Sequence, residues 1–171
     1  MTESRRRRLG LVLLWLAAAA GAVHTAFSVY WAFGGMWLLE TVGQGAVDQQ
    51  RDNRPLAASV LLLAAAVKGA GAVVPVWVEY RGGPRIRRRL RAVSWVGGAV
   101  LVCYGSVIAA VSAAVLAGAV SPGGEIDRVG LIGHALLWNP LFACWGVLLL
   151  AGLWWTRREP EAQRDRYPAG R

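Results

Sequence analysis

The chain has 171 residues, of which 56% are hydrophobic and 17% are charged, and its mean hydropathy is +0.40. A soluble globular domain carries more charge than this, so the composition excludes an ordinary soluble protein and indicates an integral membrane protein. The formal net charge of +9 does not indicate a nucleic-acid-binding protein, because the basic residues flank apolar segments, where they suit membrane topology and anionic lipid headgroups. We therefore expect no nucleic-acid partner.

The N-terminal segment is the first of four apolar segments. Four arginines precede Leu9–Leu16, and Ala20, Gly21 and Ala22 form a small-residue patch, so the segment also has the features of a cleaved signal peptide. The apolar stretch continues without a break to Phe33 and is longer than the apolar region of a signal peptide, which favours a transmembrane helix.

All four apolar segments are long enough to cross about 30 Å of hydrocarbon as helices. Because a helix satisfies its own backbone hydrogen bonds in lipid, they predict an all-α bundle of four transmembrane helices rather than a barrel. The expected spans are residues 9–33, 56–78, 93–120 and 131–155, which make residues 1–156 a single membrane domain. Residues 36–42 are expected to form a short amphipathic helix on the membrane surface, and the charged tail 157–171 is expected to be disordered.

The arginines predict the orientation of the chain. Fifteen arginines precede the first span, separate the second and third spans or follow the fourth, whereas the two opposite loops hold three. Because positively charged loops resist translocation, both termini are expected to be cytoplasmic. The excess of Arg over Lys, with abundant Ala and Gly, is typical of a GC-rich bacterial genome, so the expected location is a bacterial plasma membrane.

One polar side chain from each span is expected in the middle third of the membrane: His24, Lys68, Tyr104 and Asn139. Each costs free energy unless it is paired or hydrated, so these four are the candidate ligand-binding residues of one shared cavity. Lys68 is the most informative, because it cannot reach either interface and no predicted span contains Asp or Glu. Two interpretations stay open: Lys68 binds an anionic ligand or a lipid headgroup, or it is a packing residue bonded to Tyr104 and free carbonyl groups.

The sequence predicts no metal site and no cofactor. His134, the second histidine, is expected about 9 Å from His24 in depth and about 140° from Asn139 around the helix, which argues against haem held by two histidines. Cys103 and Cys144 lie at separate depths without the close spacing of zinc ligands. His24 is therefore expected to be a hydrogen-bonded packing residue. No motif of a nucleophile elbow, a phosphate-binding loop or a zinc protease is present, so no catalytic residue is predicted.

The most distinctive segment is HTAFSVYWAFGGMWLLETVG, residues 24–43. It resembles the bacterial four-span membrane family called domain of unknown function 3995, in which a histidine of the first helix is followed by a YWAxGGxW-like segment. The matching positions are His24, Tyr30, Trp31, Ala32, Gly34, Gly35 and Trp37. Similar size and span count extend the resemblance over residues 9–156. The resemblance implies an integral membrane protein and implies no activity.

Together these features favour a non-catalytic membrane component that binds membrane lipid or a protein partner, rather than an enzyme. Faces of small residues on the helices favour helix association, and so a homo-oligomer or a complex with another membrane protein. The alternative is a membrane-embedded enzyme or carrier for a small lipophilic anion. In that case Lys68 would hold the negative charge, His24 would transfer protons, and Tyr104 and Asn139 would orient the ligand.

Overall fold

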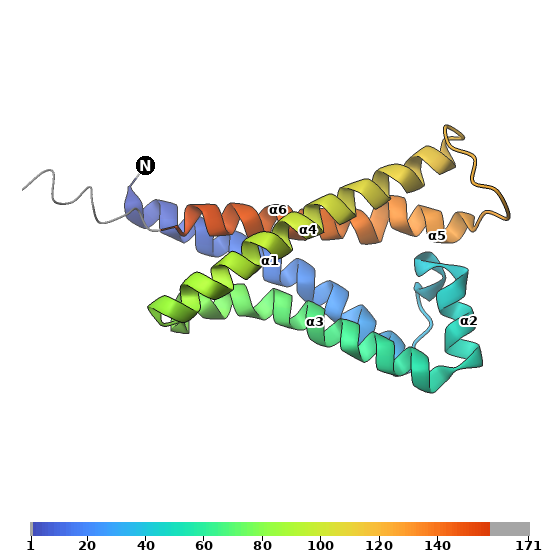
Figure 1. Ribbon diagram of the computed structural model, residues 1–171, viewed down its shortest axis with the longest axis horizontal. Coiled ribbons are helices and arrows are strands. Elements are labelled where there is room, and N and C mark those ends of the chain that lie inside the picture. The colour runs from blue at the N-terminus through green and yellow to red at the C-terminus, as the bar shows by residue number, and fades with distance from the viewer. Residues whose placement is uncertain (1, 158–171) are drawn as a thin grey trace, which may run out of the picture.

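The computed structural model describes residues 2–157, which form an all-α bundle of four long helical segments (Figure 1). Three of them are α1 (Glu3–Ala32), α3 (Arg54–Arg81) and α4 (Pro84–Leu116), and the fourth runs through α5 (Arg128–Gly133), the π-helical segment η2 (His134–Trp138) and α6 (Asn139–Trp155). By length and composition, all four are able to cross a membrane. The predicted fold class, a bundle of four transmembrane helices, is confirmed.

The helix ends differ from the predicted spans by several residues. α4 ends at Leu116 rather than at residue 120, because the chain turns at Gly118, whose φ of 74° lies in the left-handed region that favours glycine. α3 begins earlier than predicted, directly after Asn53, whose side-chain oxygen accepts a hydrogen bond from the amide of Leu56. All but one residue of the predicted tail, residues 158–171, lie outside the described part of the chain.

α1 packs against both α3 and α6. The core between these helices contains Leu14, Ala17, Ala20, Ala72, Val76, Trp145, Leu149 and Leu153. α4 packs mainly against α6, where Gly98, Gly105 and Gly146 permit a close approach of the two backbones. α3 and α4 make fewer contacts with each other and diverge from their connecting turn (Figure 1).

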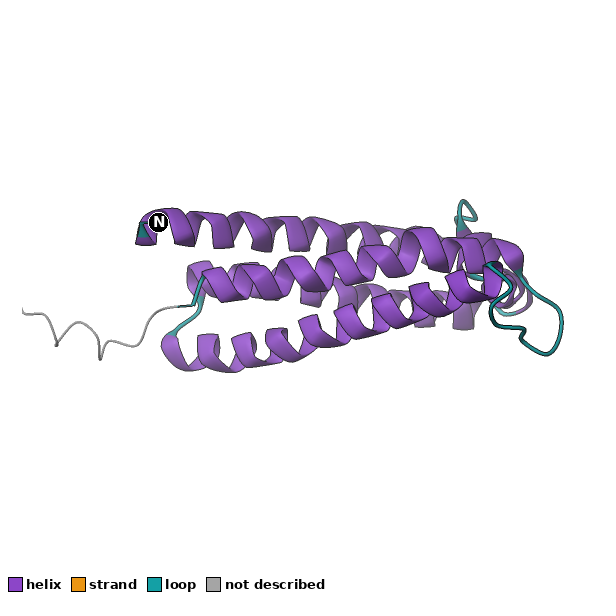
Figure 2. Cartoon of the chain, turned by 90° about the horizontal axis from the view of Figure 1, so that it is seen from above, coloured by secondary structure: helices purple, strands orange, loops and turns teal. Residues whose placement is uncertain are grey.

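The connection between α1 and α3 is folded against the bundle. It contains the 3₁₀ turn η1 (Leu39–Val42) and the helix α2 (Gln44–Asp52), which gather with the α4–α5 loop at the end opposite the N-terminus, the cap end (Figure 2). The surface helix expected over residues 36–42 is reduced to η1. Leu39 is buried against Trp31, Val47 and Trp138, so η1 packs on the cap through this side chain, whereas Met36 and Trp37 are exposed.

Asp127 joins two parts of the cap. Its carboxylate accepts hydrogen bonds from the amides of Gly130, at 2.9 Å, and of Gln44, at 2.7 Å. These two bonds lower the pKa of Asp127 below its ordinary value, because they stabilise the charged form. The carboxylate therefore ties the start of α5 to the start of α2.

We expect the cap to loosen in acid. Because the folded-state pKa of Asp127 lies below the unfolded-state value, its contribution to stability is fully present above the unfolded-state pKa and is lost as the pH falls through the folded-state pKa. Asp127→Asn should therefore speed amide hydrogen exchange at Gln44 and Gly130 at neutral pH, whereas Asp52→Asn at the exposed end of α2 should not. Equal exchange in the two variants would contradict this role of Asp127.

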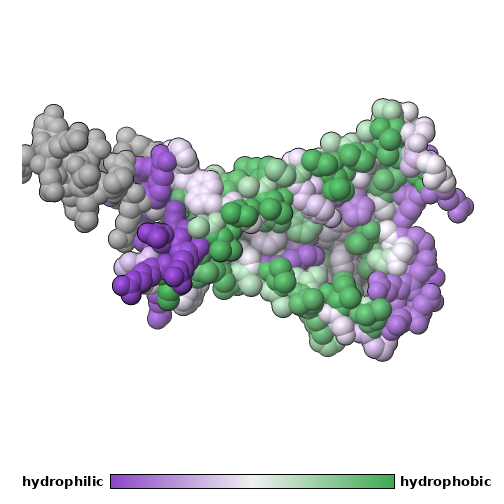
Figure 3. Space-filling view, viewed as in Figure 1, coloured by the Kyte–Doolittle hydropathy of each residue, from purple (hydrophilic) through white to green (hydrophobic). Residues whose placement is uncertain are grey.

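The surface of the bundle is an apolar band between two polar ends (Figure 3). The start of α1, the α3–α4 turn and the end of α6 meet at the end opposite the cap, here called the arginine end (Figure 1). The arginines at this end include Arg81, Arg85, Arg87, Arg88, Arg89 and Arg91. Most arginines of the described residues thus lie on one side of the apolar band, whereas Arg51, Arg54 and Arg128 lie at the cap end.

Candidate functional site

Three of the four predicted site residues contact the ring of Phe142 on α6. The His24 ring, from α1, stacks on it with a centroid distance of 3.7 Å and an interplanar angle of 14°. Lys68 Nζ, from α3, lies 5.5 Å from its centroid. Tyr104, from α4, meets it edge-on at 5.9 Å. Phe142, on α6, is thus the common contact of residues from the other three long helices, α1, α3 and α4.

Lys68 has two partners within the described residues, and neither is an anion. Its Nζ donates a hydrogen bond of 3.0 Å to Ser28 Oγ, which in turn donates to the carbonyl oxygen of His24 at 3.1 Å. A cation over an aromatic face gains about 1 to 2 kcal/mol, but this contact does not neutralise the charge. In the described part of the chain the carboxylate of Glu79 pairs with arginines, and no ion pair involves Lys68.

His24 is enclosed among aromatic side chains. It is 2% exposed, and besides Phe142 its ring lies near Trp138, at 5.9 Å, and Trp145, at 6.3 Å. Its Nε2, like Gln50 Oε1 and Trp145 Nε1, is buried and has no hydrogen-bond partner among the described residues. The expectation that His24 is a hydrogen-bonded packing residue stays a prediction.

Asn139 is held elsewhere, by His134. Its Nδ2 lies 3.0 Å from Nδ1 of His134 and donates to the His134 carbonyl oxygen at 3.1 Å, and the other ring nitrogen, Nε2, lies 3.0 Å from the Val42 carbonyl oxygen. One neutral tautomer satisfies both ring nitrogens, with the proton on Nε2. His134 therefore joins η1 to the fourth helical segment, and Asn139 orients its ring.

The predicted separation of His134 and Asn139 around the helix was wrong. It assumed an α-helix, whereas residues 134–138 form a π-helical turn. In such a turn the backbone hydrogen bonds join residues that are five apart rather than four. The wider turn places residue i+5 above residue i, so the two side chains meet. Pro140, which lacks an amide hydrogen, follows directly and is compatible with this interruption of the α-helical pattern.

The space between the diverging helices leaves Lys68 partly accessible. Figure 3 shows the face between α3 and α4 hollowed, with hydrophilic side chains inside the hollow and apolar surfaces on both sides. Lys68 is half-buried, and Tyr104, which is 50% exposed, lies on the α4 side. The recess opens onto the apolar band (Figure 3).

A second polar cluster, which the sequence did not predict, lies at the arginine end. Glu79, near the end of α3, is buried and pairs with both Arg87 and Arg91 of α4. Arg91 also donates to Thr156 Oγ1 at 2.9 Å and to the Leu153 carbonyl oxygen at 2.6 Å, which joins α3 and α4 to the end of α6. Glu79 is the first residue after the predicted span 56–78. Its pairing depends on the hairpin, which returns α4 alongside the last turns of α3.

A family model described as protein of unknown function (DUF3995) matches residues 20–149. The match includes the positions from His24 to Trp37 and confirms the family resemblance read from that segment. No curated protein and no solved structure matches the chain.

Proposed function

The chain belongs to the family of unknown function DUF3995, and we propose from its own geometry that it is a non-catalytic membrane component that binds an acidic lipid beside Lys68. The proposed location is a bacterial plasma membrane, with both termini cytoplasmic. This orientation follows from the basic residues at the arginine end, because positively charged segments stay on the cytoplasmic side.

The observation that carries the proposal is that Lys68 has no acidic partner among the described residues. An unpaired cation at bilayer depth is costly, and such residues usually face an internal partner or a functional site. The hydroxyl of Ser28 and the ring of Phe142 orient the ammonium group without supplying a negative charge. An anionic group entering the recess would supply it, in a medium where the attraction of opposite charges is strong.

The shape of the recess supports a lipid as the ligand. It opens between α3 and α4 onto the apolar band (Figure 3). In a membrane, an acyl chain could therefore lie against the apolar sides of these helices while its acidic group meets Lys68. A helix of a partner protein or of a second copy is the competing occupant of the same recess. A lipid, a partner protein and a second copy of the chain differ in mass, so mass spectrometry of the intact complex distinguishes these occupants directly.

We expect native mass spectra of the protein released from bacterial membranes to show a bound acidic lipid that is absent from Lys68→Met. Methionine keeps the length and apolar contacts of the side chain and removes the charge. Lys68→Arg is the matched control, because it keeps the charge and should keep the adduct. Loss of the adduct from both variants, or its retention in Lys68→Met, would contradict the role of the charge. A bound protein in place of a lipid would favour the partner-binding function.

A carrier or enzyme for a small lipophilic anion is the second candidate. It is favoured by the buried Nε2 of His24, which has no partner among residues 2–157 and lies at the same ring as Lys68. In this function Lys68 would hold the anion and His24 would exchange a proton with it. A flux of the anion into proteoliposomes that stops in Lys68→Met would identify a carrier, because a static lipid site produces no flux.

A further inference from the structure

Lys68 lies at the middle of α3. The helix runs from Arg54 to Arg81, so Lys68 is about 20 Å from either end at a rise of about 1.5 Å per residue, farther than its side chain reaches. The amino group is held at this depth, because Nζ donates a hydrogen bond to Ser28 Oγ and lies over the ring of Phe142. A ligand that pairs with Lys68 must therefore bring its acidic group deep into the hydrocarbon of a membrane.

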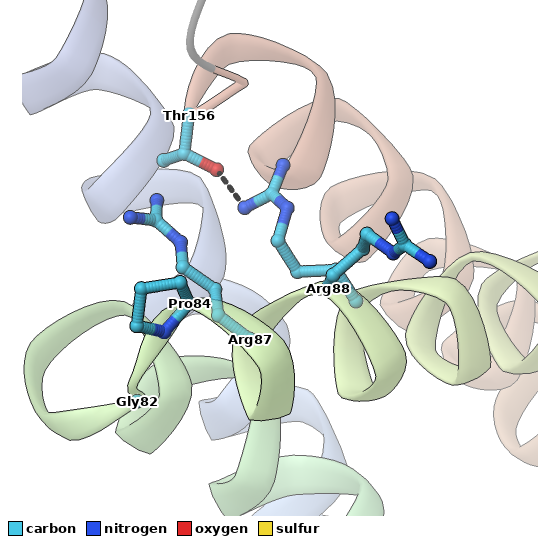
Figure 4. Close-up of a pocket in the computed structure, with 6 residues that line it drawn as sticks. Gly82, Pro84, Arg87, Arg88 and Thr156 are labelled. Carbon is cyan, nitrogen blue, oxygen red and sulfur yellow. Dashed lines mark hydrogen bonds between the residues drawn. The ribbon is translucent and has the colours of Figure 1, made fainter.

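This depth disfavours a phospholipid as the ligand. The phosphates of phospholipids lie outside a hydrocarbon layer about 30 Å thick, about 15 Å or more from its middle. A phosphodiester keeps its negative charge at physiological pH, so moving it to the level of Lys68 would carry a charge into hydrocarbon at high cost. Basic side chains that suit phosphates at the membrane surface lie instead at the arginine end, where an arginine of α4 donates a hydrogen bond to Thr156 (Figure 4).

A free fatty acid can bring its acidic group to this depth. The carboxyl group is its only charged group and becomes neutral when it takes up a proton, the usual response of an acid that enters an apolar medium. Its pair with Lys68 carries no net charge wherever the proton lies, as a carboxylic acid beside the amine or as a carboxylate beside the ammonium group. In the second form the hydrogen bond between the two groups is charge-assisted and strong.

We propose that the acidic lipid of the Lys68 recess is a free fatty acid, whose carboxyl group pairs with Lys68 deep in the membrane. Its single acyl chain lies against the apolar surfaces of α3 and α4, between which the recess opens onto the apolar band (Figure 3). This inference rests on the function proposed above and narrows it to one class of ligand, a carboxylic acid with one chain.

The test uses the full chain in phosphatidylcholine nanodiscs and counts bound molecules by native mass spectrometry. Three probes are added at equal mole fraction: oleic acid, oleyl alcohol, which has the same chain without an acid, and phosphatidylglycerol, which has a phosphodiester. Wild type and Lys68→Met are compared for each probe. The comparison of oleic acid with oleyl alcohol also stands on the wild type alone, so it does not depend on the folding of the variant.

We expect oleic acid to bind Lys68→Met about tenfold more weakly than wild type, the loss of one charge-assisted hydrogen bond. Oleyl alcohol should bind both forms as weakly as oleic acid binds the variant, and binding of phosphatidylglycerol should be the same in both forms. Equal binding of oleic acid and oleyl alcohol to the wild type would overturn the inference.

The probes also separate this inference from the proposed function on which it rests. Binding of phosphatidylglycerol that depends on Lys68 and equals or exceeds that of oleic acid would overturn the fatty acid and support the proposed site for an acidic lipid. If binding of none of the three probes depended on Lys68, the fatty acid and the proposed lipid site would both be wrong.

Discussion

Replacing Glu79 by alanine is expected to lower the free energy of unfolding by about 3 to 5 kcal/mol, the usual cost of removing one partner of a buried ion pair. The Glu79 side chain has no exposed surface, and its two partners, Arg87 and Arg91, are about 15% exposed. Without the carboxylate, both guanidinium groups lose the partner that they share at the helix interface. The reversible unfolding of the protein in detergent micelles measures the loss.

Two variants control this prediction. Glu79→Gln keeps the volume and one acceptor oxygen, so we expect a smaller loss than in Glu79→Ala. Glu40→Ala removes an exposed carboxylate at the cap end and should change the free energy of unfolding by less than about 0.5 kcal/mol. If Glu79→Ala and Glu40→Ala were equally stable, the cluster at the arginine end would not hold α3, α4 and α6 together.

Gly105→Ala is expected to destabilise the protein by about 1 to 3 kcal/mol, because the close packing of α4 on α6 leaves no room for a methyl group. A Cβ at Gly105 would lie 2.5 Å from the Asn139 carbonyl oxygen and 2.6 Å from the amide nitrogen of Ala143. Both atoms belong to the backbone of α6, so no side-chain rotation relieves the overlap, and the helices must separate.

Gly97→Ala is the matched control on the same helix. A Cβ at Gly97 meets nothing within 4 Å, and alanine is the better helix former by up to about 1 kcal/mol. Gly97→Ala should therefore leave thermal unfolding unchanged or raise its midpoint, while Gly105→Ala lowers it. A similar shift in both variants would show that helix propensity, rather than contact with α6, decides the effect.

The sequence determined which segments form the bundle. Transfer of a side chain from water to lipid depends mainly on that side chain, so its contribution can be summed along the chain before any tertiary contact is known. A sum of this kind detects only apolar segments, and this explains why α2 was not predicted. It is a short helix of polar residues, and its place depends on the burial of Val47 and Gln50 against the rest of the cap.

The sequence also allowed a prediction of depth in the membrane, because an α-helix rises by a constant distance per residue. His24, Lys68 and Tyr104 were each expected in the middle third of the membrane, and in the structure all three contact Phe142. Asn139 departs from this pattern, since the π-helical turn before it changes the direction of its side chain and directs it to His134. No periodicity in the sequence marks that turn.

Only the tertiary structure decided which side chains become partners in hydrogen bonds, ring contacts and ion pairs. Phe142 and Ser28 carry no signal of chemistry in the sequence, yet they are the two partners of Lys68. The pairing of Glu79 with Arg91 likewise requires the hairpin between α3 and α4. Polarity, span and depth are properties of one residue or one helix and can be read along the chain. Contacts between helices depend on how several surfaces fit together at once, and this fit exists only after the helices have packed.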